Sequence, residues 1–353
     1  MIKEESISQE WIEHVAKSGK ADKILVEKAV RALILLEGLS VSGLNFRFKG
    51  GTALMLLLSS GKRLSIDIDI VVADKAPDLS DIMDAVSHYK GFLRYEKQER
   101  KAASTIDKEH YKLFFQSVIE KKEAYVLLDV LKEKILYENV IEIPVNSLFI
   151  IQSGEAAKVK VPDFNNLLGD KLTAFAPNTI GIPYKKGDKE MGMEIIKQMY
   201  DIGSLFDYVD NVRVVASVFS AFAETEIGYR GNKYNVQDVL TDAIDNALEI
   251  CLRGNHGKAN YDILLKGIQQ VRGFIFSESF HLEKAITYAA KTAYIASLIK
   301  YGQTEIKRFD ASRLSEIQTW QITEPLNTKL NKIKKTDVEA FFYLYQTHTM
   351  NVL

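Results

Sequence analysis

Two aspartates lie two residues apart in the stretch "SIDIDIVV", where they alternate with isoleucine. Successive side chains of a β-strand point to opposite faces, so Asp67 and Asp69 share one face and the isoleucines share the other. Carboxylates about 7 Å apart along a strand repel each other unless a cation or solvent intervenes. Magnesium binds a few carboxylates together with substrate phosphate oxygens. The pair therefore predicts either a magnesium site or the wet polar face of a half-exposed strand.

A third carboxylate, Asp129, lies within the apolar stretch "AYVLLDVL", on the same face of a predicted strand as Leu127 and Leu131. An unpaired carboxylate would be costly in that setting if it were buried. An edge strand or a salt bridge would explain Asp129. A metal site that it completes with Asp67 and Asp69 from a neighbouring strand would explain all three residues together, and we favour that interpretation.

A glycine pair precedes the aspartates. Gly50, Gly51 and Thr52 stand between a predicted strand, "FRF", and a predicted buried helix, "TALMLLLSS". Such a turn lets the backbone approach a phosphate closely, with N–H groups and the threonine hydroxyl directed at it. Arg63 and Ser65 stand just before the aspartate strand, where they could brace the site or contact phosphate; a surface role is equally open for Arg63.

A lysine stands on the apolar stripe of a later helix. In "NNLLGDKLTAFA", Lys171 falls between Leu167, Leu168 and Phe175. The side chain could snorkel at the margin of the stripe, or it could point into a cleft and neutralise nucleotide phosphates. In the second case its removal is expected to leave folding intact.

The elements that position these residues change in kind along the chain. Residues 8–37 read as two helices that end at Gly38, and Pro77 is expected to open an amphipathic helix that runs to Tyr89. "YKLFFQSVIE" and "AYVLLDVLKE" read as two strands joined by "KKE". From Pro162 onward the hydrophobic period is almost entirely helical, beginning with a helix for which Asp163 is the expected N-cap. The sequence thus predicts an α/β (α+β) protein with a domain at 1–160 and a helical domain at 161–353.

Composition places further limits on the function. The formal net charge is −1, so a nucleic-acid partner would have to be held by local patches. The single cysteine, Cys251, fits a reducing compartment, the polar start argues against secretion, and the apolar runs are too short to span a bilayer. A cytoplasmic protein without membrane association is expected. The six histidines show no metal-ligand spacing, so a zinc site is not supported.

Two basic stretches could contact RNA. One is the loop that carries Lys185, Lys186 and Lys189, and the other is "KLNKIKK" near the C-terminus. Runs of charge usually form solvated surfaces, so that alternative stays open for both.

The quoted residues resemble a known family. "GGTALMLLLSSGKRLSIDIDI" is similar to the signature of the AbiEii-type nucleotidyltransferase toxins, type IV toxin–antitoxin proteins of the DNA polymerase β superfamily, in which a glycine pair, a helix and a D-x-D strand follow one another. The family's second motif resembles "GDKLTAF", which supplies Lys171, and "KQMYDI", which supplies Lys197 and Asp201. Gln198 stands where the family commonly has aspartate. The resemblance covers roughly residues 45–205.

The resemblance implies a small mixed-sheet nucleotidyltransferase core followed by a mostly helical domain that completes the active-site cleft. It implies an enzyme that transfers a nucleoside monophosphate from NTP to an acceptor and releases pyrophosphate. Two Mg²⁺ ions would be held by Asp67, Asp69 and Asp129, which would be catalytic together with Lys171 and Asp201. Gly50, Gly51, Thr52, Arg63, Ser65 and Lys171 would bind the nucleotide.

The acceptor that the resemblance implies is the 3′ end of tRNA, and the role is that of a growth-arresting toxin in a toxin–antitoxin or antiviral (phage-defence) system, with a cognate antitoxin as a separate protein. Two alternatives stay open. One is the same chemistry on a protein or small-molecule acceptor, and the other is a non-catalytic nucleotide- or RNA-binding protein on the same fold.

Overall fold

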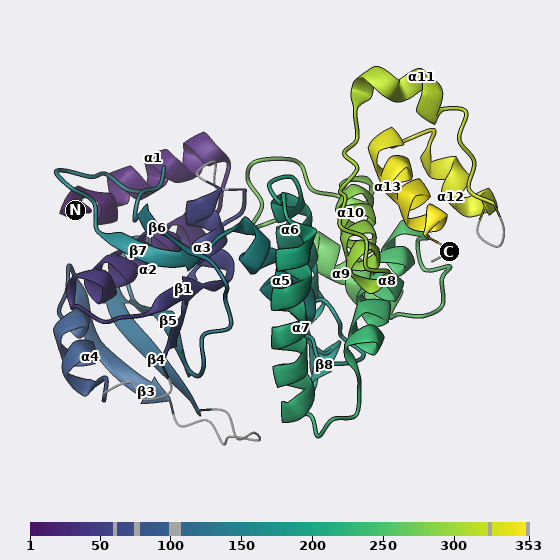
Figure 1. The fold of residues 1–353 in the computed structure, drawn as a ribbon. Helices are drawn as coiled ribbons and strands as arrows, with labels where there is room; N and C mark the ends of the chain where they lie inside the picture. The colour runs from purple at the N-terminus through teal and green to yellow at the C-terminus, as the bar shows by residue number, and fades with distance from the viewer. Residues whose placement is uncertain (59–61, 74–77, 99–106, 324–326, 351–353) are drawn as a thin grey trace. The chain divides into compact units, whose positions relative to one another are not determined.

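The computed structural model describes residues 1–58, 62–73, 78–98, 107–323 and 327–350. The chain forms two compact units. Unit 1 comprises Met1–Asp163 and Gly273–Ser279, and unit 2 comprises Phe164–Arg272 and Phe280–Leu353. Unit 1 mixes strands with helices and unit 2 is mostly helical (Figure 1), so the predicted α/β class with a helical C-terminal region is confirmed.

The centre of unit 1 is a five-stranded mixed sheet. In spatial order its strands are β1 (Arg47–Lys49), β2 (Asp67–Val72), β5 (Glu123–Lys132), β4 (Asp107–Gln116) and β3 (Phe92–Gln98). The strands β2 and β5 run parallel, and every other neighbouring pair is antiparallel. The two strands that carry the aspartates are therefore direct neighbours, although they are far apart in sequence.

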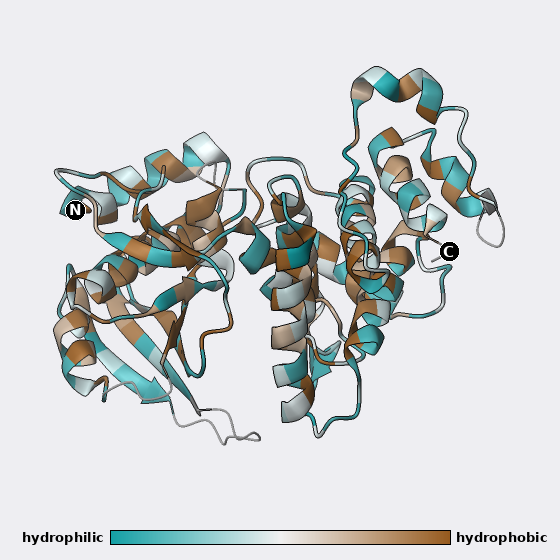
Figure 2. Cartoon of the chain, in the orientation of Figure 1, coloured by the Kyte–Doolittle hydropathy of each residue, from teal (hydrophilic) through white to brown (hydrophobic). Residues whose placement is uncertain are grey.

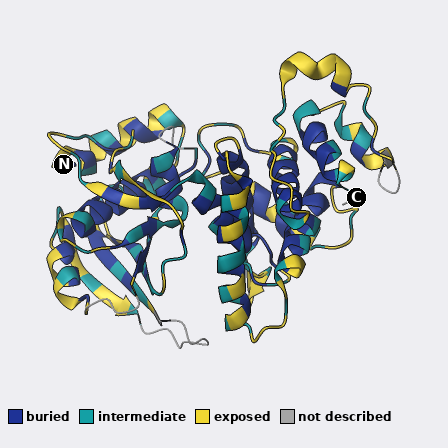
Figure 3. Cartoon of the chain, viewed as in Figure 1, coloured by how far each residue is buried: buried dark blue, intermediate teal, exposed yellow. Residues whose placement is uncertain are grey.

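One face of this sheet is packed against helices. Unit 1 contains η1 (Glu4–Ile7), α1 (Gln9–Gly19), α2 (Lys23–Val41), α3 (Gly50–Leu57) and α4 (Ser80–Ser87). The side chain of Asp22 caps α2 by accepting the N–H groups of Ile24 and Leu25. The inward-facing residues of β2, among them Ile68 and Ile70, join α2 in one buried apolar core, which is brown in Figure 2 and dark blue in Figure 3.

The helix α2 does not end at Gly38, as the sequence predicts, but continues to Val41. A Cβ at position 38 would lie 3.1 Å from a ring carbon of Tyr89. The glycine therefore serves close packing against this ring instead of ending the helix.

Two strands and a distant segment complete unit 1. β6 (Val140–Pro144) and β7 (Lys158–Pro162) form a separate antiparallel pair. Residues 273–279, which we call the strap, come from the connection between two helices of unit 2. The strap carbonyl of Phe274 accepts the N–H of Leu64 at 2.8 Å, and Ile275 forms a bridge with Arg63.

Unit 2 is built from helices around α10 (Leu282–Lys300). This alanine-rich helix is buried along most of its length and packs against α6, α8 and α13. The other elements of unit 2 are α5 (Phe164–Ala174), β8 (Lys185–Lys186), β9 (Lys189–Glu190), α6 (Gly192–Phe206), α7 (Val212–Tyr229), α8 (Val236–Cys251), α9 (Tyr261–Val271), η2 (Ala311–Arg313), α11 (Leu314–Ile317), α12 (Asn327–Ile333) and α13 (Val338–Thr349).

Other expectations differ from the structure in detail. The strands β3, β6 and β7 are not anticipated by the sequence reading, and Pro77 lies outside the described residues. The chain divides at Asp163, but the strap belongs to unit 1, which a single boundary near 160 does not allow for. Within the described residues, no helix combines the length and the apolar character needed to cross a membrane.

Candidate active site

The three predicted carboxylates lie on one side of two adjacent strands. Asp69 on β2 is the register partner of Asp129 on β5, and Asp67 lies opposite Leu127. Neighbouring strands are about 4.8 Å apart, so the side chains of Asp69 and Asp129 stand next to each other. Asp67 is exposed, and the side chain of Asp129 is 41% exposed. The result is three carboxylates on one face of the sheet, where Lys49 of β1 is the register partner of Asp69 on its other side.

A histidine that the sequence analysis does not single out adjoins this group. His110 on β4 is the register partner of Asp129 on the other side of β5, and its Nδ1 lies 2.6 Å from Asp129 Oδ1. The histidine side chain is only 14% exposed. One carboxylate oxygen of Asp129 is thus held in place from the neighbouring strand. Because the contact depends on the register of β4 with β5, sequence spacing alone does not reveal it.

The glycine pair lies against the same group. Gly50 has a φ of +79°, and a Cβ there would lie 2.1 Å from Asp69 Oδ2. A Cβ on Gly51 would lie 2.7 Å from both Arg63 Nη2 and Ser65 Oγ. Any larger residue at either position would therefore collide with a polar side chain of the site. The structure brings together four of the predicted nucleotide-binding residues and Asp69.

Arg63 is not a surface residue. It is 6% exposed, its Nη1 donates to the carbonyl of Leu64 at 3.1 Å, and its backbone bridges to Ile275 of the strap. A buried guanidinium beside the glycine turn can offer planar N–H donors to a phosphate group.

Thr52 differs from the expectation that its hydroxyl faces phosphate. The residue is fully buried, and its Oγ1 donates to the backbone carbonyl of Asp67 at 2.6 Å. The hydroxyl therefore ties the start of α3 to the start of β2. Thr52 positions the aspartate strand in this structure and does not present its hydroxyl to a ligand.

Lys171 and Asp201 form a second group, in unit 2. Lys171 on α5 lies 2.7 Å from Asp201 Oδ2 on α6, and it donates to Gln198 Oε1 at 3.3 Å. The side chains of Lys171 and Asp201 are 6% and 0% exposed. The alternative that Lys171 snorkels at the margin of the apolar stripe is therefore wrong, because the two charges are buried and compensate each other.

The predicted magnesium ligands are Asp67, Asp69 and Asp129. Within the part of the chain that the structure describes, no group of three or more histidine, cysteine or acidic side chains is arranged to hold a metal ion. The donor atoms of Asp67, Asp69 and Asp129 are nonetheless carboxylate oxygens, the kind that magnesium prefers. The three aspartates therefore fit a magnesium ion by donor type, although their side chains do not converge on one point in this structure.

Both predicted basic stretches lie in unit 2. Lys185, Lys186 and Lys189 are exposed on the β8–β9 hairpin, where Lys189 lies 3.4 Å from a carboxylate oxygen of Glu194. In the C-terminal stretch, Lys334 donates to the carbonyl of Gln318 at 3.0 Å and so serves the local fold.

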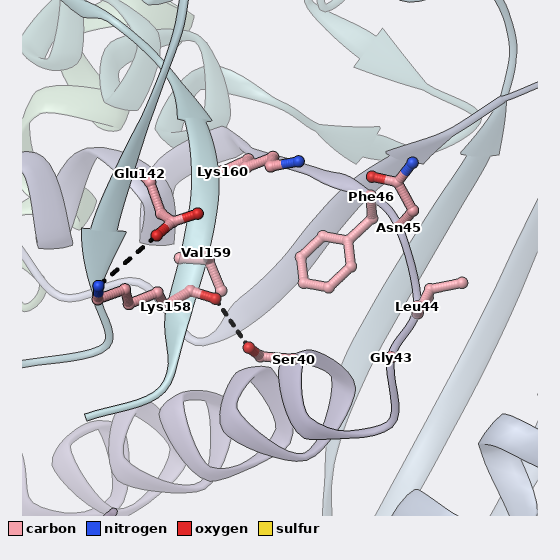
Figure 4. A pocket seen from close by; sticks show the side chains of 9 residues that line it. All are labelled: Ser40, Gly43, Leu44, Asn45, Phe46, Glu142, Lys158, Val159 and Lys160. Carbon is pink, nitrogen blue, oxygen red and sulfur yellow. Dashed lines mark hydrogen bonds and ion pairs between the residues drawn. The ribbon is translucent and has the colours of Figure 1, made fainter. Parts of the chain in front are cut away.

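A separate hollow of about 350 Å³ in unit 1 contains none of the predicted site residues. It lies between β7 and the connection from α2 to β1 (Figure 4). Lys158 is 3.8 Å from Glu142 there, and Ser40 donates to the carbonyl of Lys158 at 2.8 Å. Its lining contains a single carboxylate, Glu142, so it does not repeat the grouping of acidic side chains found on the aspartate face.

Comparison with known proteins gives one family match. The model described as "Nucleotidyl transferase AbiEii toxin, Type IV TA system" matches residues 34–269, a span that contains every predicted site residue. A comparison with curated proteins gives no match.

Two solved structures from Helicobacter pylori are similar to the chain. One is a protein provisionally described as a nucleotidyltransferase, with 16% identity and a TM-score of 0.42, covering 78% of this chain and 94% of its own. The other is JHP933, with 15% identity and a TM-score of 0.42, covering 84% of this chain and 94% of its own.

Proposed function

The chain belongs to the AbiEii nucleotidyltransferase toxin family, and from this premise we propose that it transfers a nucleoside monophosphate from an NTP to the 3′ end of tRNA. In this reaction the acceptor hydroxyl oxygen forms a bond to the α-phosphorus. The bond from that phosphorus to the β-phosphate bridging oxygen breaks, and pyrophosphate leaves with the electron pair. The hydroxyl proton passes to a base on the enzyme.

The observation that carries the proposal is the shared sheet face. Asp67, Asp69 and Asp129 lie together there, and Asp69 also lies against the glycine pair. Nucleotide transfer needs a cation site beside a place where the triphosphate can approach the backbone closely. The aspartates supply carboxylate oxygens for the cation site. The glycine turn and Arg63 supply hydrogen-bond donors for the triphosphate.

We assign the residues the following roles. Asp67, Asp69 and Asp129 hold magnesium, which when bound neutralises negative charge on the triphosphate. Asp129 also receives the acceptor proton, with His110 orienting its carboxylate through the 2.6 Å contact.

The remaining roles concern phosphate. Arg63 and Ser65 contact the phosphates beside the glycine turn. Lys171 contacts phosphate, as the family motif implies, and Asp201 and Gln198 hold its ammonium group in place.

The test is incubation of the protein with each labelled NTP, magnesium and total cellular RNA, followed by separation of the products. Label in the tRNA band, lost when a chelator is added, supports the proposal. Label in the protein or in a small molecule would show that the acceptor is that molecule and not tRNA. NTP or RNA binding without pyrophosphate release would indicate a non-catalytic binding protein.

The family description also gives the biological setting, a type IV toxin–antitoxin system. We propose that transfer to tRNA arrests growth by blocking aminoacylation, that a separate antitoxin counteracts it, and that the pair serves antiviral defence. Induced expression should stop cell growth, and the Asp67→Asn variant at equal abundance should not. Growth arrest by both forms would contradict a toxic activity that depends on catalysis.

A further inference from the structure

Unit 2 contains an open cavity of about 730 Å³ that none of the predicted site residues lines. It lies where the loop that follows α8 meets the start of α9, and Asn178 and Tyr184 from the connection between α5 and α6 close its other side. Ligand pockets for molecules of nucleotide size typically measure about 300–1,000 Å³. The cavity is large enough for one or two nucleotides.

The lining combines aromatic rings with positive charge. Tyr184 and Tyr261 are half-buried, and Arg253 and Lys258 are exposed. Asp262 contributes one negative charge, so the lining is positive by one charge. Asparagine side chains add amide donors and acceptors, at positions 178, 255 and 260. Rings that stack bases, cations that contact phosphates and amides that bond base edges are the groups by which proteins bind single-stranded RNA.

The loop from 253 to 260 is held in shape by α8. Glu249 is 1% exposed, and its Oε2 accepts the backbone N–H groups of Lys258 and Ala259 at 2.9 and 3.0 Å. His256 Nε2 lies 2.8 Å from Asp245 Oδ1. Two carboxylates of one helix thus fix the loop, and a preformed wall reduces the entropy lost on binding.

Tyr184 is anchored from behind. Its hydroxyl donates to Asn246 Oδ1, and burial raises the pKa of the phenol to about 12. Asn246 in turn donates to Asp242, which also accepts the backbone N–H and the side-chain amide of Asn178. Two residues of the lining therefore belong to one buried hydrogen-bond network, which holds them in place relative to each other.

The basic hairpin continues this surface. Tyr184 directly precedes Lys185 and Lys186 of β8. Lys266 of α9 lies 3.1 Å from Glu190 of β9, which ties the hairpin to the helix that begins at the cavity. The exposed lysines of the hairpin thus lie next to the cavity. Three of the cations here have acidic partners, since Lys189 lies 3.4 Å from Glu194, Lys266 lies 3.1 Å from Glu190 and Arg253 lies 3.4 Å from Glu283.

We propose that this cavity binds a single-stranded segment of the acceptor RNA, with bases stacked on Tyr184 and Tyr261 and phosphates on Arg253 and Lys258. The inference rests on the proposed function, which supplies RNA as the acceptor. A protein partner fits less well, because the centres of protein interfaces are apolar and depleted in charge, whereas this lining is polar and positively charged.

The experiment measures binding of a fluorescein-labelled, unstructured RNA oligonucleotide to the full chain by anisotropy, without NTP, over a range of salt concentrations. Tyr261→Leu should weaken binding about 5- to 150-fold, since stacking contributes about 1–3 kcal/mol per base, and should leave the salt slope unchanged. Lys258→Glu should weaken binding and reduce the salt slope. Tyr261→Phe keeps the ring and should bind as the wild type does.

Lys233→Glu is the matched control, because Lys233 is exposed in unit 2 but does not line the cavity. Unchanged binding by Tyr261→Leu and Lys258→Glu would overturn the proposal, as would an equal loss in the control. Complete displacement of the RNA by AMP would also overturn it, by showing a mononucleotide site.

The two proposals can fail separately. If label from NTP enters RNA but the cavity variants bind RNA as the wild type does, the cavity proposal is contradicted and the proposed function still holds. If the cavity variants weaken RNA binding but the label enters protein, the cavity is an RNA-binding site and the proposal that tRNA is the acceptor is contradicted.

Discussion

Asp129 has a different partner on each side of its strand: Asp69 on β2 and His110 on β4. The sequence indicates the first neighbour for two reasons. The strand period places Asp67 and Asp69 on one face, and a carboxylate within an apolar strand suggests that Asp129 lies beside a metal or other polar groups. It does not indicate the second, since a cross-strand contact depends on register, which one strand's sequence does not specify.

Asp67→Asn should abolish nucleotide transfer while leaving stability unchanged or raised. The substitution removes a negative charge from a face that carries three carboxylates, so repulsion falls. The backbone carbonyl that accepts the Thr52 hydroxyl is unaffected. Pyrophosphate release and the thermal unfolding midpoint measure the two effects.

Asp81→Asn is the control for this variant, because it removes an exposed aspartate of α4 in the same unit and should keep activity. Retained transfer by Asp67→Asn would contradict the assigned role. Unfolding of Asp67→Asn would show that the carboxylate supports the fold.

Lys171→Ala should destabilise the protein, contrary to what the sequence leads one to expect. The motif identifies the lysine, but its buried partner on another helix is visible only in the structure. Removing one member of a buried ion pair leaves the other uncompensated and costs about 3–5 kcal/mol. Urea unfolding measures the change.

The double variant Lys171→Met with Asp201→Leu leaves no unpaired charge, so it should be more stable than Lys171→Ala. If the two variants unfold at the same urea concentration, or Lys171→Ala matches the wild type, the ion pair does not contribute as the structure indicates.

Among the secondary-structure elements, some strands of unit 1 can be predicted from the hydrophobic pattern of the sequence and others cannot. Apolar alternation predicts β2 and β5, which carry the site. β3 and β6 expose most of their residues, so neither has a buried apolar face to produce the signal. The glycine turn is predicted from its residue types, yet the collision of any Cβ with Asp69 or Arg63 is a property of the folded chain.

Glu109 joins three strands of the sheet and makes stability depend on pH. Its carboxylate accepts from Lys97 of β3, Tyr111 of β4 and Lys132 of β5. Burial alone would raise the pKa of Glu109, but these hydrogen bonds outweigh it and lower the pKa from 4.5 to about 2. Because the folded-state pKa is the lower one, the stabilisation is complete above pH 4.5 and is lost as pH falls from there toward 2.

The urea midpoint should therefore fall between pH 5 and pH 2.5, with Glu109 contributing roughly 1 kcal/mol, as suits pairs near the surface. Glu109→Gln should be less stable than the wild type at pH 6, and the difference should shrink as pH falls. A difference that stays constant with pH would show that the carboxylate charge is not the cause.

At the scale of the whole molecule, the strap makes unit 1 depend on residues that lie far along the chain. Ile275 is 7% exposed, and Phe276 packs edge-on against Phe149 with ring centroids 5.4 Å apart. The sequence shows three large apolar residues in the strap, Phe274, Ile275 and Phe276, but no local pattern indicates which distant part of the chain they pack against.

Ile275→Ala should lower the stability of unit 1 by about 2–5 kcal/mol, the usual cost of such a truncation in a core. The protein has two tryptophans, Trp11 in unit 1 and Trp320 in unit 2. In a Trp320→Phe background, Trp11 fluorescence reports on unit 1, and its urea midpoint should fall in the Ile275→Ala variant. Ser279→Ala, at the exposed end of the strap, is the control. An unchanged Trp11 transition would mean that the strap does not stabilise unit 1.

The strap also sets an order of events during synthesis on the ribosome. Domains generally fold as units while the chain emerges, the N-terminal one first. Unit 1 lacks the backbone partners of Arg63 and Leu64 until Phe274 and Ile275 have left the exit tunnel. By then much of unit 2 has also been translated. A nascent chain that stalls before this point carries Asp67, Asp69 and Asp129 but not the segment that bridges to Arg63, so the residues proposed to bind phosphate gain their full support only late in translation.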